Sequence, residues 1–553
     1  MTRMSKNKIK KLVELEKVNH PDQSTENFEE NLRRDISTDR QKFLEFLDEN
    51  KSLKWERNEI PTQWIFEAWP TDFDELGEKM TSQVYFKMLK EEVVYSFDGW
   101  ARKLGLCCSA VSKQVTRSYI CNGGRGCEIR AGGTYFTREV DGVQTMFCKS
   151  HKNKSKTDGW TEHLNDEEED EVRLRCRKCK RYAHVVCSLF DVTRSPELFL
   201  CKRCLVNKCE PILATKALGE SKIAAHMMAT LNPFFITIGC ENTTVALLSS
   251  GYCDGVVQNT KLREWFKAVN APEANPFIYK HIGVFQNSGD GTHDVQFFDM
   301  IVHEYVCGEK KGSVHLHYLD TNDHFRPYAK KGIAYRQIIA AYWVYAESVG
   351  FVDCHIHACP PQKGDSWLFW GHPKSQHYST ETQLSNFYAK TIDEAKENHN
   401  IVGHHPKFDL TKHNSIASII KELYTEDGLW QKLIVSRLEK KKWSSEETLE
   451  SFKTFVKNSL DAHKDVLFWV DIRKKTARKT DNIKILDRDE VFPSSFANTR
   501  DNWLDKQLEY NLQFDTVRTA TYSTRMLLIL LQQERKTLKR RQQAKRKCRE
   551  DID

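Results

Sequence analysis

The sequence predicts a mixed α/β fold, with helices covering a central sheet, preceded by small zinc-binding modules. The first observation is the order strand, basic loop, helix, strand between Ser313 and Cys359, which is typical of a β-α-β unit. The second is the crowding of cysteines, because ten of the 17 lie between Cys107 and Cys204, several of them as C-x2-C pairs. Together they predict a sheet domain that follows a metal-binding segment.

The bulk composition favours a soluble chain of more than one domain. Of the 553 residues, 39% are hydrophobic and 29% are charged, which is enough to build cores beneath a charged surface. No apolar run reaches 18 residues, and the basic N-terminus has no apolar signal core, so neither a membrane helix nor secretion is expected. In a reducing compartment such cysteine pairs bind zinc more often than they form disulfides.

Composition also divides the chain into segments. Residues 1–59 are polar and charge-rich, which predicts a disordered lead-in, and residues 60–105 have helical periodicity. The zinc modules follow at 106–209 and the mixed sheet domain at 214–535. The last segment, 536–553, is strongly basic: it is a solvated tail, a nuclear import signal or a nucleic-acid contact.

Within the sheet domain, four strands and one helix can be assigned. Residues 281–307 indicate a strand, a turn at "NSGDG" and a second strand, and residues 313–320 indicate another strand. Residues 333–350 indicate a helix that ends at Gly350, and residues 351–359 the strand after it.

The spacing of cysteines and histidines predicts two tetrahedral zinc sites. Four pairs occur in order, and eight such ligands satisfy two ions. Cross-bracing is expected, in which the first and third pairs share one zinc ion and the second and fourth share the other. The eight expected ligands are Cys148, His151, Cys176, Cys179, His184, Cys187, Cys201 and Cys204.

Four cysteines further upstream have irregular spacing and allow two interpretations. They hold a third zinc ion in a RING-like arrangement, or Cys107 and Cys108 merely pack as small hydrophobic side chains. The four residues are Cys107, Cys108, Cys121 and Cys127.

The stretch from Cys354 to Tyr378 is rich in histidine and aromatic residues. His355, His357 and Cys359 alternate along a strand and would share one face, where a metal could bind. No second close pair accompanies them, and a Pro-Pro loop bends the chain away at once. We therefore interpret the strand as the wall of a ligand cleft.

Several motifs in this part of the chain resemble a known family. "HYLDTNDHFRP", "HACPPQKGDSWLFWGHP", "LSNFYAK" and "LQFDTVRTATYSTRMLLILLQQ" occur in the order found in histone acetyltransferases of the CREB-binding-protein (CBP) type. The resemblance implies an α/β (α+β) acetyltransferase domain behind RING-like and PHD modules. It also makes residues 60–105 a candidate bromodomain remnant, in which Asp72 replaces an asparagine, so no acetyl-lysine binding is expected.

By the same resemblance, Tyr388 is the general acid, since a phenol remains protonated at neutral pH and can protonate a departing thiolate. His357 stands where the family has tryptophan, and a histidine there either orients the lysine amine or leaves the cleft wall incomplete.

The resemblance also implies which residues bind acetyl-CoA. Lys331 and Gly332 replace an Arg-Thr pair, so a lysine ammonium would contact phosphate instead of the planar guanidinium of arginine. The full expected set is Leu319, Asp320, Thr321, Lys331, Gly332, Tyr335, Cys359, Pro360, Gln376 and Phe387.

These implications predict a nuclear lysine acetyltransferase and transcriptional coactivator. It would use acetyl-CoA, carry two or three structural Zn²⁺ ions, and act with histones, other nuclear proteins, transcription factors and chromatin, but with no membrane. The alternative is a catalytically weak, chromatin-associated scaffold or reader that keeps the same fold. A RING ubiquitin ligase is disfavoured by the incomplete RING spacing.

Overall fold

The computed structural model describes residues 114–550, apart from residues 117, 124–126, 131–132, 141, 156, 167, 179, 181, 201–214, 288–292, 362–364, 374, 400, 405–407, 441–446, 474–483, 487–488 and 490. The expected lead-in at 1–59 and the helical segment at 60–105 lie outside these residues.

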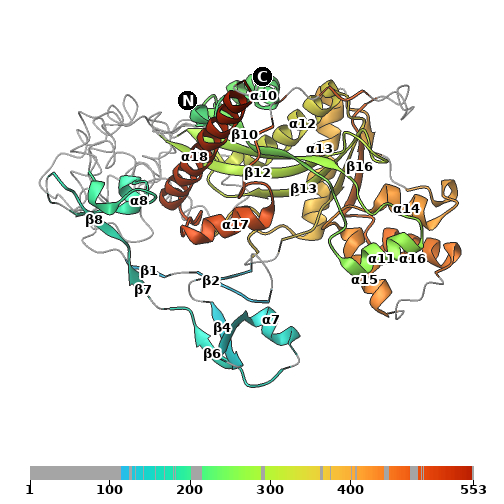
Figure 1. The fold of residues 1–553 in the computed structure, drawn as a ribbon, viewed down its shortest axis with the longest axis horizontal. Coiled ribbons are helices and arrows are strands. Elements are labelled where there is room, and N and C mark those ends of the chain that lie inside the picture. Colours follow the sequence, from blue (N-terminus) through green and yellow to red (C-terminus); the bar gives the residue numbers. More distant parts are fainter. Residues whose placement is uncertain are drawn as a thin grey trace, which may run out of the picture.

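A seven-stranded mixed sheet forms the centre of the molecule (Figure 1). Its strand order is β10-β11-β12-β13-β14-β16-β15, and every neighbouring pair is antiparallel except β13 and β14. The strands are β10 (Thr243–Cys253), β11 (Phe277–Asn287), β12 (Asp294–Glu304), β13 (Ser313–Thr321), β14 (Asp353–His357), β15 (Gly403–His404) and β16 (Leu467–Asp471). The predicted mixed sheet with covering helices is thereby confirmed.

The parallel pair exists because a long helix returns the chain to the same end of the sheet. Helix α12 (Lys331–Val349) follows β13, and its buried side chains include Ile338, Tyr342 and Trp343. It ends at Gly350, whose φ of 113° is left-handed, a conformation in which glycine avoids the strain of a side chain. The predicted helix and its predicted cap are therefore correct.

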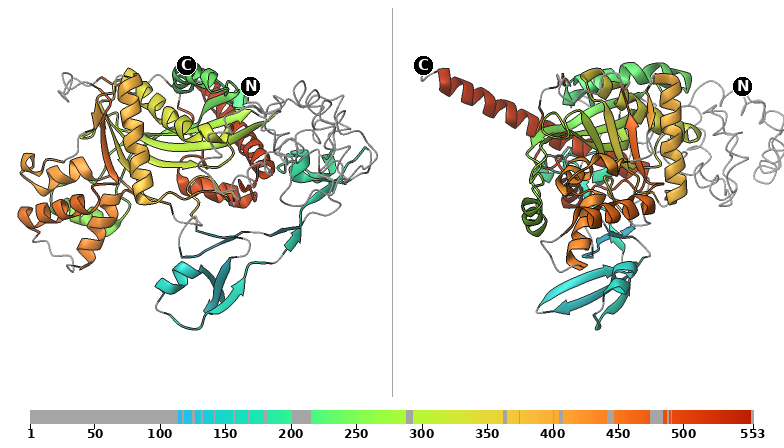
Figure 2. Two further views of the ribbon diagram at one scale, coloured as in Figure 1. Left: turned by 180° about the vertical axis from the view of Figure 1, so that it is seen from behind. Right: turned by 90° about the vertical axis from the view of Figure 1, so that its right-hand side faces the viewer.

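Helices cover both faces of the sheet. Helices α10 (Lys222–Thr237), α12 and α13 (Glu381–His399) contribute to the largest apolar core, together with residues such as Ile282 and Met300. Helix α18 (Val517–Glu550) packs on the other face, with α17 (Arg500–Glu509) beside it (Figure 1). Helix α18 continues through the expected basic tail as far as Glu550, and Figure 2 shows its end projecting from the body.

A smaller helical cluster lies beside the sheet, on the right in Figure 1. It consists of α11 (Thr260–Ala268), α14 (Ile416–Leu423), α15 (Leu429–Lys440) and α16 (Leu449–Ala462). Trp469 of β16 packs into the same apolar cluster, so the helices are joined to the sheet.

The cysteine-rich segment is built from short strands. Strands β4 (Thr134–Val140), β5 (Val143–Cys148) and β6 (Thr161–Leu164) form one sheet, and α7 (Lys149–Lys154) follows β5. Three two-stranded sheets complete the segment: β1 (Gln114–Thr116) with β7 (Glu168–Asp170), β2 (Tyr119–Ile120) with β3 (Glu128–Ile129), and β8 (Arg173–Arg175) with β9 (Tyr182–His184). Helix α8 (Val185–Ser188) follows β9 and leads toward α18.

Candidate active site and metal centres

A cavity of about 140 Å³ opens where the parallel strands β13 and β14 end. The ends of β13 and β14, the chain from 358 to 379 and helix α13 supply its walls. Several predicted residues line it: Leu319, Asp320, Thr321, His357, Cys359, Gln376 and Tyr388. The remaining predicted residues do not line it: Lys331, Gly332, Tyr335, Pro360 and Phe387.

Tyr388 is the buried phenol of this cavity. It lies on α13, one turn after Leu384, which also lines the cavity, and only 5% of the residue is exposed. Its ring centroid is 5.7 Å from that of Phe468 and 5.4 Å from that of Phe387, so aromatic groups fix its orientation. Burial raises the pKa of the Tyr388 hydroxyl above its usual value, and the group is therefore protonated at neutral pH.

His357 lines the same cavity, at the end of β14. Burial, with the nearby positive charges of His463 and Lys432, lowers the pKa of its imidazole to about 4. The ring is consequently neutral at pH 7 and can accept a proton or a hydrogen bond.

Asp320 organises the loop that closes the cavity. One carboxylate oxygen accepts the backbone N–H groups of Leu368 (2.8 Å) and Phe369 (3.0 Å), and the other lies 2.9 Å from Nε2 of His372. Burial alone would raise the pKa of Asp320, but His372 and these N–H donors outweigh it and hold the pKa below its ordinary value. Asp320 is thus an ionised structural anchor of the loop.

Two further predicted residues hold the backbone at the end of β13 by hydrogen bonds. The Gln376 side-chain amide donates to the Thr321 carbonyl at 2.8 Å, and the Tyr335 hydroxyl donates to the Asn322 carbonyl at 2.8 Å. Both contacts hold the end of β13, where the chain leaves the sheet.

Lys331 is already engaged in an ion pair. Its Nζ donates to Asp323 at 2.6 Å and to the Tyr328 hydroxyl at 2.8 Å, so its charge is partly neutralised before any phosphate arrives. Gly332 beside it is open, since an added Cβ would meet nothing closer than Arg336 Nη1 at 3.6 Å.

The sequence reasoning missed several cavity residues, namely His317, Tyr318, Asp365, Trp367 and His372. The partner of His372 is Asp320, 52 positions away, and no local spacing reports such a contact. The cysteine-rich segment also reaches this cavity, because Arg130 donates to the Tyr378 hydroxyl at 2.6 Å and Cys127 forms a backbone bridge with Asp365.

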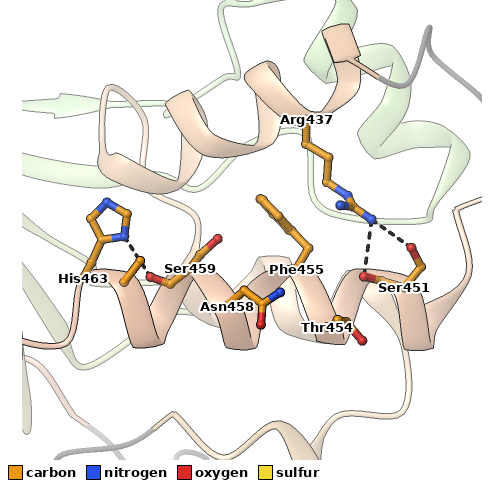
Figure 3. Close-up of a pocket in the computed structure, with 8 residues that line it drawn as sticks. Arg437, Ser451, Thr454, Phe455, Asn458, Ser459 and His463 are labelled. Atoms are coloured by element: carbon orange, nitrogen blue, oxygen red, sulfur yellow. Dashed lines mark hydrogen bonds between the residues drawn. The ribbon is translucent and has the colours of Figure 1, made fainter.

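A larger hollow of about 480 Å³ lies between α15 and α16 (Figure 3). Arg437 donates to the Ser451 hydroxyl at 2.9 Å there, and Nδ1 of His463 lies 2.8 Å from the Ser459 carbonyl. None of the predicted site residues lines it, so it is separate from the cavity beside Tyr388.

One cluster in the cysteine-rich segment has the ligands of a zinc site. The donor atoms of Cys121, Cys127, Cys148 and His151 all lie within 4.8 Å of one another. The Cys127 and Cys148 sulfurs are 3.7 Å apart, close to the roughly 3.8 Å that a tetrahedral zinc ion imposes on two thiolates. The backbone N–H groups of Gly123 and Cys148 also donate to the Cys121 sulfur, as they do to a thiolate. These residues fit Zn²⁺.

This grouping differs from the expected one. Cys148 and His151 join Cys121 and Cys127, rather than His184 and Cys187 as cross-bracing of the four pairs requires. The cause is strand pairing, since Cys121 follows β2, Cys127 precedes β3 and Cys148 ends β5. His184 and Cys187 belong to β9 and α8, in a separate sheet.

The remaining predicted ligands are only partly described. Cys176, His184 and Cys187 are buried, and Arg518 of α18 donates to the Cys187 sulfur at 3.1 Å. The other predicted ligands, Cys107, Cys108, Cys179, Cys201 and Cys204, lie outside the described residues.

Comparison with known proteins gives a match for the central sheet. Residues 240–497, which include β10 to β16, match the model of the histone acetyltransferase domain KAT3. This part of the chain is therefore similar to a histone acetyltransferase domain.

Relatives from animals and plants agree with this class. Protein cbp-1 of Caenorhabditis elegans is 24% identical over 400 residues, which cover 65% of this chain and 20% of that protein. Histone acetyltransferase HAC4 of Arabidopsis thaliana is 26% identical over 273 residues, which cover 42% of this chain and 18% of the relative. The chain spans about a fifth of the length of these relatives. Among the described residues, no helix is long and apolar enough to cross a bilayer.

Proposed function

We propose that this protein transfers acetyl groups from acetyl-CoA to lysine amines of histones and other nuclear proteins. The observation that carries the proposal is Tyr388, a buried and protonated phenol in the wall of a cavity, within the matched histone acetyltransferase domain.

Tyr388 acts as the general acid in the proposed step. The lysine nitrogen attacks the thioester carbon, a C–N bond forms, and the C–S bond breaks with its electron pair on sulfur. Tyr388 donates its phenolic proton to that sulfur, because a thiol is a better leaving group than a thiolate. The new amide nitrogen loses its extra proton to water, and water returns a proton to Tyr388.

The other cavity residues position the reactants. Neutral His357 accepts a hydrogen bond from the incoming amine and so orients the nucleophile toward the thioester. Asp320 holds the loop from Leu368 that closes the cavity, while Leu319, Thr321, Cys359 and Gln376 offer an apolar and hydrogen-bonding wall to the pantetheine arm. Lys331 and the Gly332 backbone meet phosphate outside the cavity, and Tyr335, Pro360 and Phe387 support the wall from behind.

We also propose that zinc stabilises the cysteine-rich segment. Cys121, Cys127, Cys148 and His151 hold one ion, and the donor set fills all four positions, so the ion is structural. Cys176, Cys179, His184, Cys187, Cys201 and Cys204 supply the ligands for a second, PHD-like site.

The test is acetyl transfer by the purified full chain to histone-tail peptides with labelled acetyl-CoA. Tyr388→Phe removes only the hydroxyl group, and with it the proton donor, and should reduce the rate by about 10²- to 10⁴-fold. Tyr252→Phe, at a residue that is 62% exposed, is the matched control and should leave the rate unchanged. Equal rates for wild type and Tyr388→Phe would refute the general-acid role.

One observation favours a second candidate, a chromatin-bound scaffold with weak catalysis. Lys331 already forms an ion pair with Asp323, and neither Lys331 nor Gly332 lines the cavity. Their contacts with the cofactor phosphates therefore contribute less binding free energy than an unpaired arginine guanidinium would. If neither wild type nor Tyr388→Phe transfers label above a reaction without protein, while wild type still binds histone tails, the scaffold role replaces the enzyme.

Nuclear localisation, transcription factors and chromatin as partners, and a coactivator role follow from the same family and remain part of the proposal. Deleting residues 536–553 tests the first, since loss of the basic segment should shift a fluorescent fusion from the nucleus to the cytoplasm.

A further inference from the structure

Three histidines meet on one face of the central sheet, next to the cavity of Tyr388. His303 lies on β12, and its Cα partner across the strand pair is His315 of β13. His317 lies two residues further along β13, where the register shifts between Ile301 and Val302. This bulge inserts His317 as an extra residue and turns its ring toward the other two. The nearest nitrogen atoms of the three rings all lie within 4.8 Å of one another.

The cluster sits in an apolar setting that leaves ring nitrogens unsatisfied. The His303 ring is stacked between Phe277, at 4.0 Å, and His317, at 4.2 Å. His303 is 8% exposed and His315 is 7% exposed. Within the described part of the chain, Nδ1 of His303 and Nδ1 of His315 have no hydrogen-bond partner. Buried polar atoms without partners are uncommon in native proteins, and a bound ion is one of the causes.

Imidazole is a common ligand for transition metals. Each neutral ring carries one nitrogen lone pair that can bind a cation.

The cluster is accessible from two sides. His317 lines the cavity that also contains Asp320 and Tyr388. His315 lines a second cavity of about 570 Å³, together with Asp353 and Trp469. An ion can thus reach the histidines without opening the sheet.

We propose that His303, His315 and His317 bind one divalent transition-metal ion, zinc, whose fourth position faces the Tyr388 cavity and carries an exchangeable water. Imidazole ligands without carboxylates favour zinc, copper and nickel over magnesium and calcium. Three histidines plus water is a coordination known for zinc with an open position. A tetrahedral ion needs neighbouring nitrogens roughly 3.3 Å apart, and His317 can move to meet that need because it is only half-buried.

This site differs from the cysteine cluster in two ways. Its ligands come from the interior of the large sheet, which is flanked by an extensive apolar core. Its fourth position is open, so bound zinc should exchange with free zinc far faster than an ion enclosed by four protein ligands.

The experiment compares zinc binding by the full chain and two variants. Wild type is purified with its cysteine-bound zinc retained, and added zinc is then followed by isothermal titration and elemental analysis. His317→Asn removes one ligand, while His404→Asn changes an exposed histidine as the control. We expect one additional equivalent of zinc in wild type and in His404→Asn, and at least 100-fold weaker binding in His317→Asn.

Two further measurements keep the outcome decisive. Thermal unfolding in the absence of added zinc should be alike for His317→Asn and wild type, which excludes misfolding as the cause of lost binding. Cobalt added as the extra equivalent should give visible bands without sulfur-to-cobalt charge transfer, because no thiolate is a ligand. Equal uptake by all three proteins, or sulfur charge transfer in the extra equivalent, would overturn the site. Neither readout depends on acetyl transfer, so this inference and the proposed function can fail separately.

Discussion

The cysteine-rich segment and the sheet domain reach stability by different means. In the described part of the segment around Cys176, the apolar core consists of a few side chains such as Ala183 and Phe199, whereas a single core of the sheet domain extends from Ile223 to Ile472. Below a certain size a chain cannot bury enough apolar surface to fold, and a metal supplies the missing free energy. With zinc bound as proposed, metal ligands hold one region together and apolar packing holds the other.

The largest effect is expected from removal of metal, which should unfold the cysteine-rich segment and leave the sheet domain folded. Chelation, or Cys148→Ser, should unfold β4, β5 and α7, because structural zinc contributes on the order of 10 kcal/mol to such modules. Hydrogen exchange should rise throughout residues 134–154 and stay unchanged in β11 and β12. Cys307→Ser changes an exposed cysteine and serves as control. If the amides of β4 and β5 remained protected from exchange after chelation, the cysteine-rich segment would not depend on metal for its fold.

The next-largest effect is expected when the apolar core of the sheet domain is weakened and the metal is left in place. Ile339→Ala opens a cavity in the main core, where the side chain is fully buried, and should lower the free energy of unfolding by about 4 kcal/mol. Denaturant unfolding measures the loss, and zinc content should remain as in wild type. Ile236→Ala, at a residue that is 61% exposed, should cost less than about 0.5 kcal/mol.

A somewhat smaller effect is expected where the regions meet. Arg518 pairs with Glu171 at 2.6 Å and also donates to Cys187, and both charged side chains are buried. Arg518→Met leaves a buried carboxylate without its partner and should cost about 3 kcal/mol. Hydrogen exchange in β9 and α8 should accelerate, while Arg473→Met, which removes the longer ion pair with Glu347 at 3.7 Å, should have no such effect. Unchanged exchange in β9 and α8 would mean that the ion pair does not join the regions.

The smallest effect is a pH dependence within the sheet domain. The pKa of His357 is about 4 in the folded chain, below the roughly 6.5 of a histidine in an unfolded chain. Between these pH values the imidazole of His357 is protonated in the unfolded chain but not in the folded one. Stability should therefore fall as pH drops from about 6.5 to 4, with His357 contributing about 1–2 kcal/mol of the loss. His357→Gln should show a shallower slope over that window and no difference above pH 7. Parallel slopes would assign the loss to other histidines.

Local patterns in the sequence predicted much of the sheet domain. Alternation and the "NSGDG" turn predicted β11 and β12, and helical periodicity with Gly350 predicted α12, because those signals act within one element. The family resemblance then placed Tyr388, and the structure puts it in the cavity wall.

Contacts between distant segments could not be predicted in the same way. The pairing of Asp320 with His372 and the grouping of Cys121 with Cys148 depend on which strands meet, and no spacing along the chain records that. The position of His317 depends on a bulge, which one shift of register creates. Such features follow from topology and become visible only after the sheet is assembled.

The contact between Arg518 and Cys187 also imposes an order of events on synthesis. The two residues are 331 positions apart, so the ribosome releases the cysteine-rich segment long before it makes the helix that secures it. At typical translation rates the wait lasts roughly 15–65 s. Throughout that interval the newborn segment must remain folded without its final support, and prompt capture of zinc would protect its thiols from oxidation and from wrong partners.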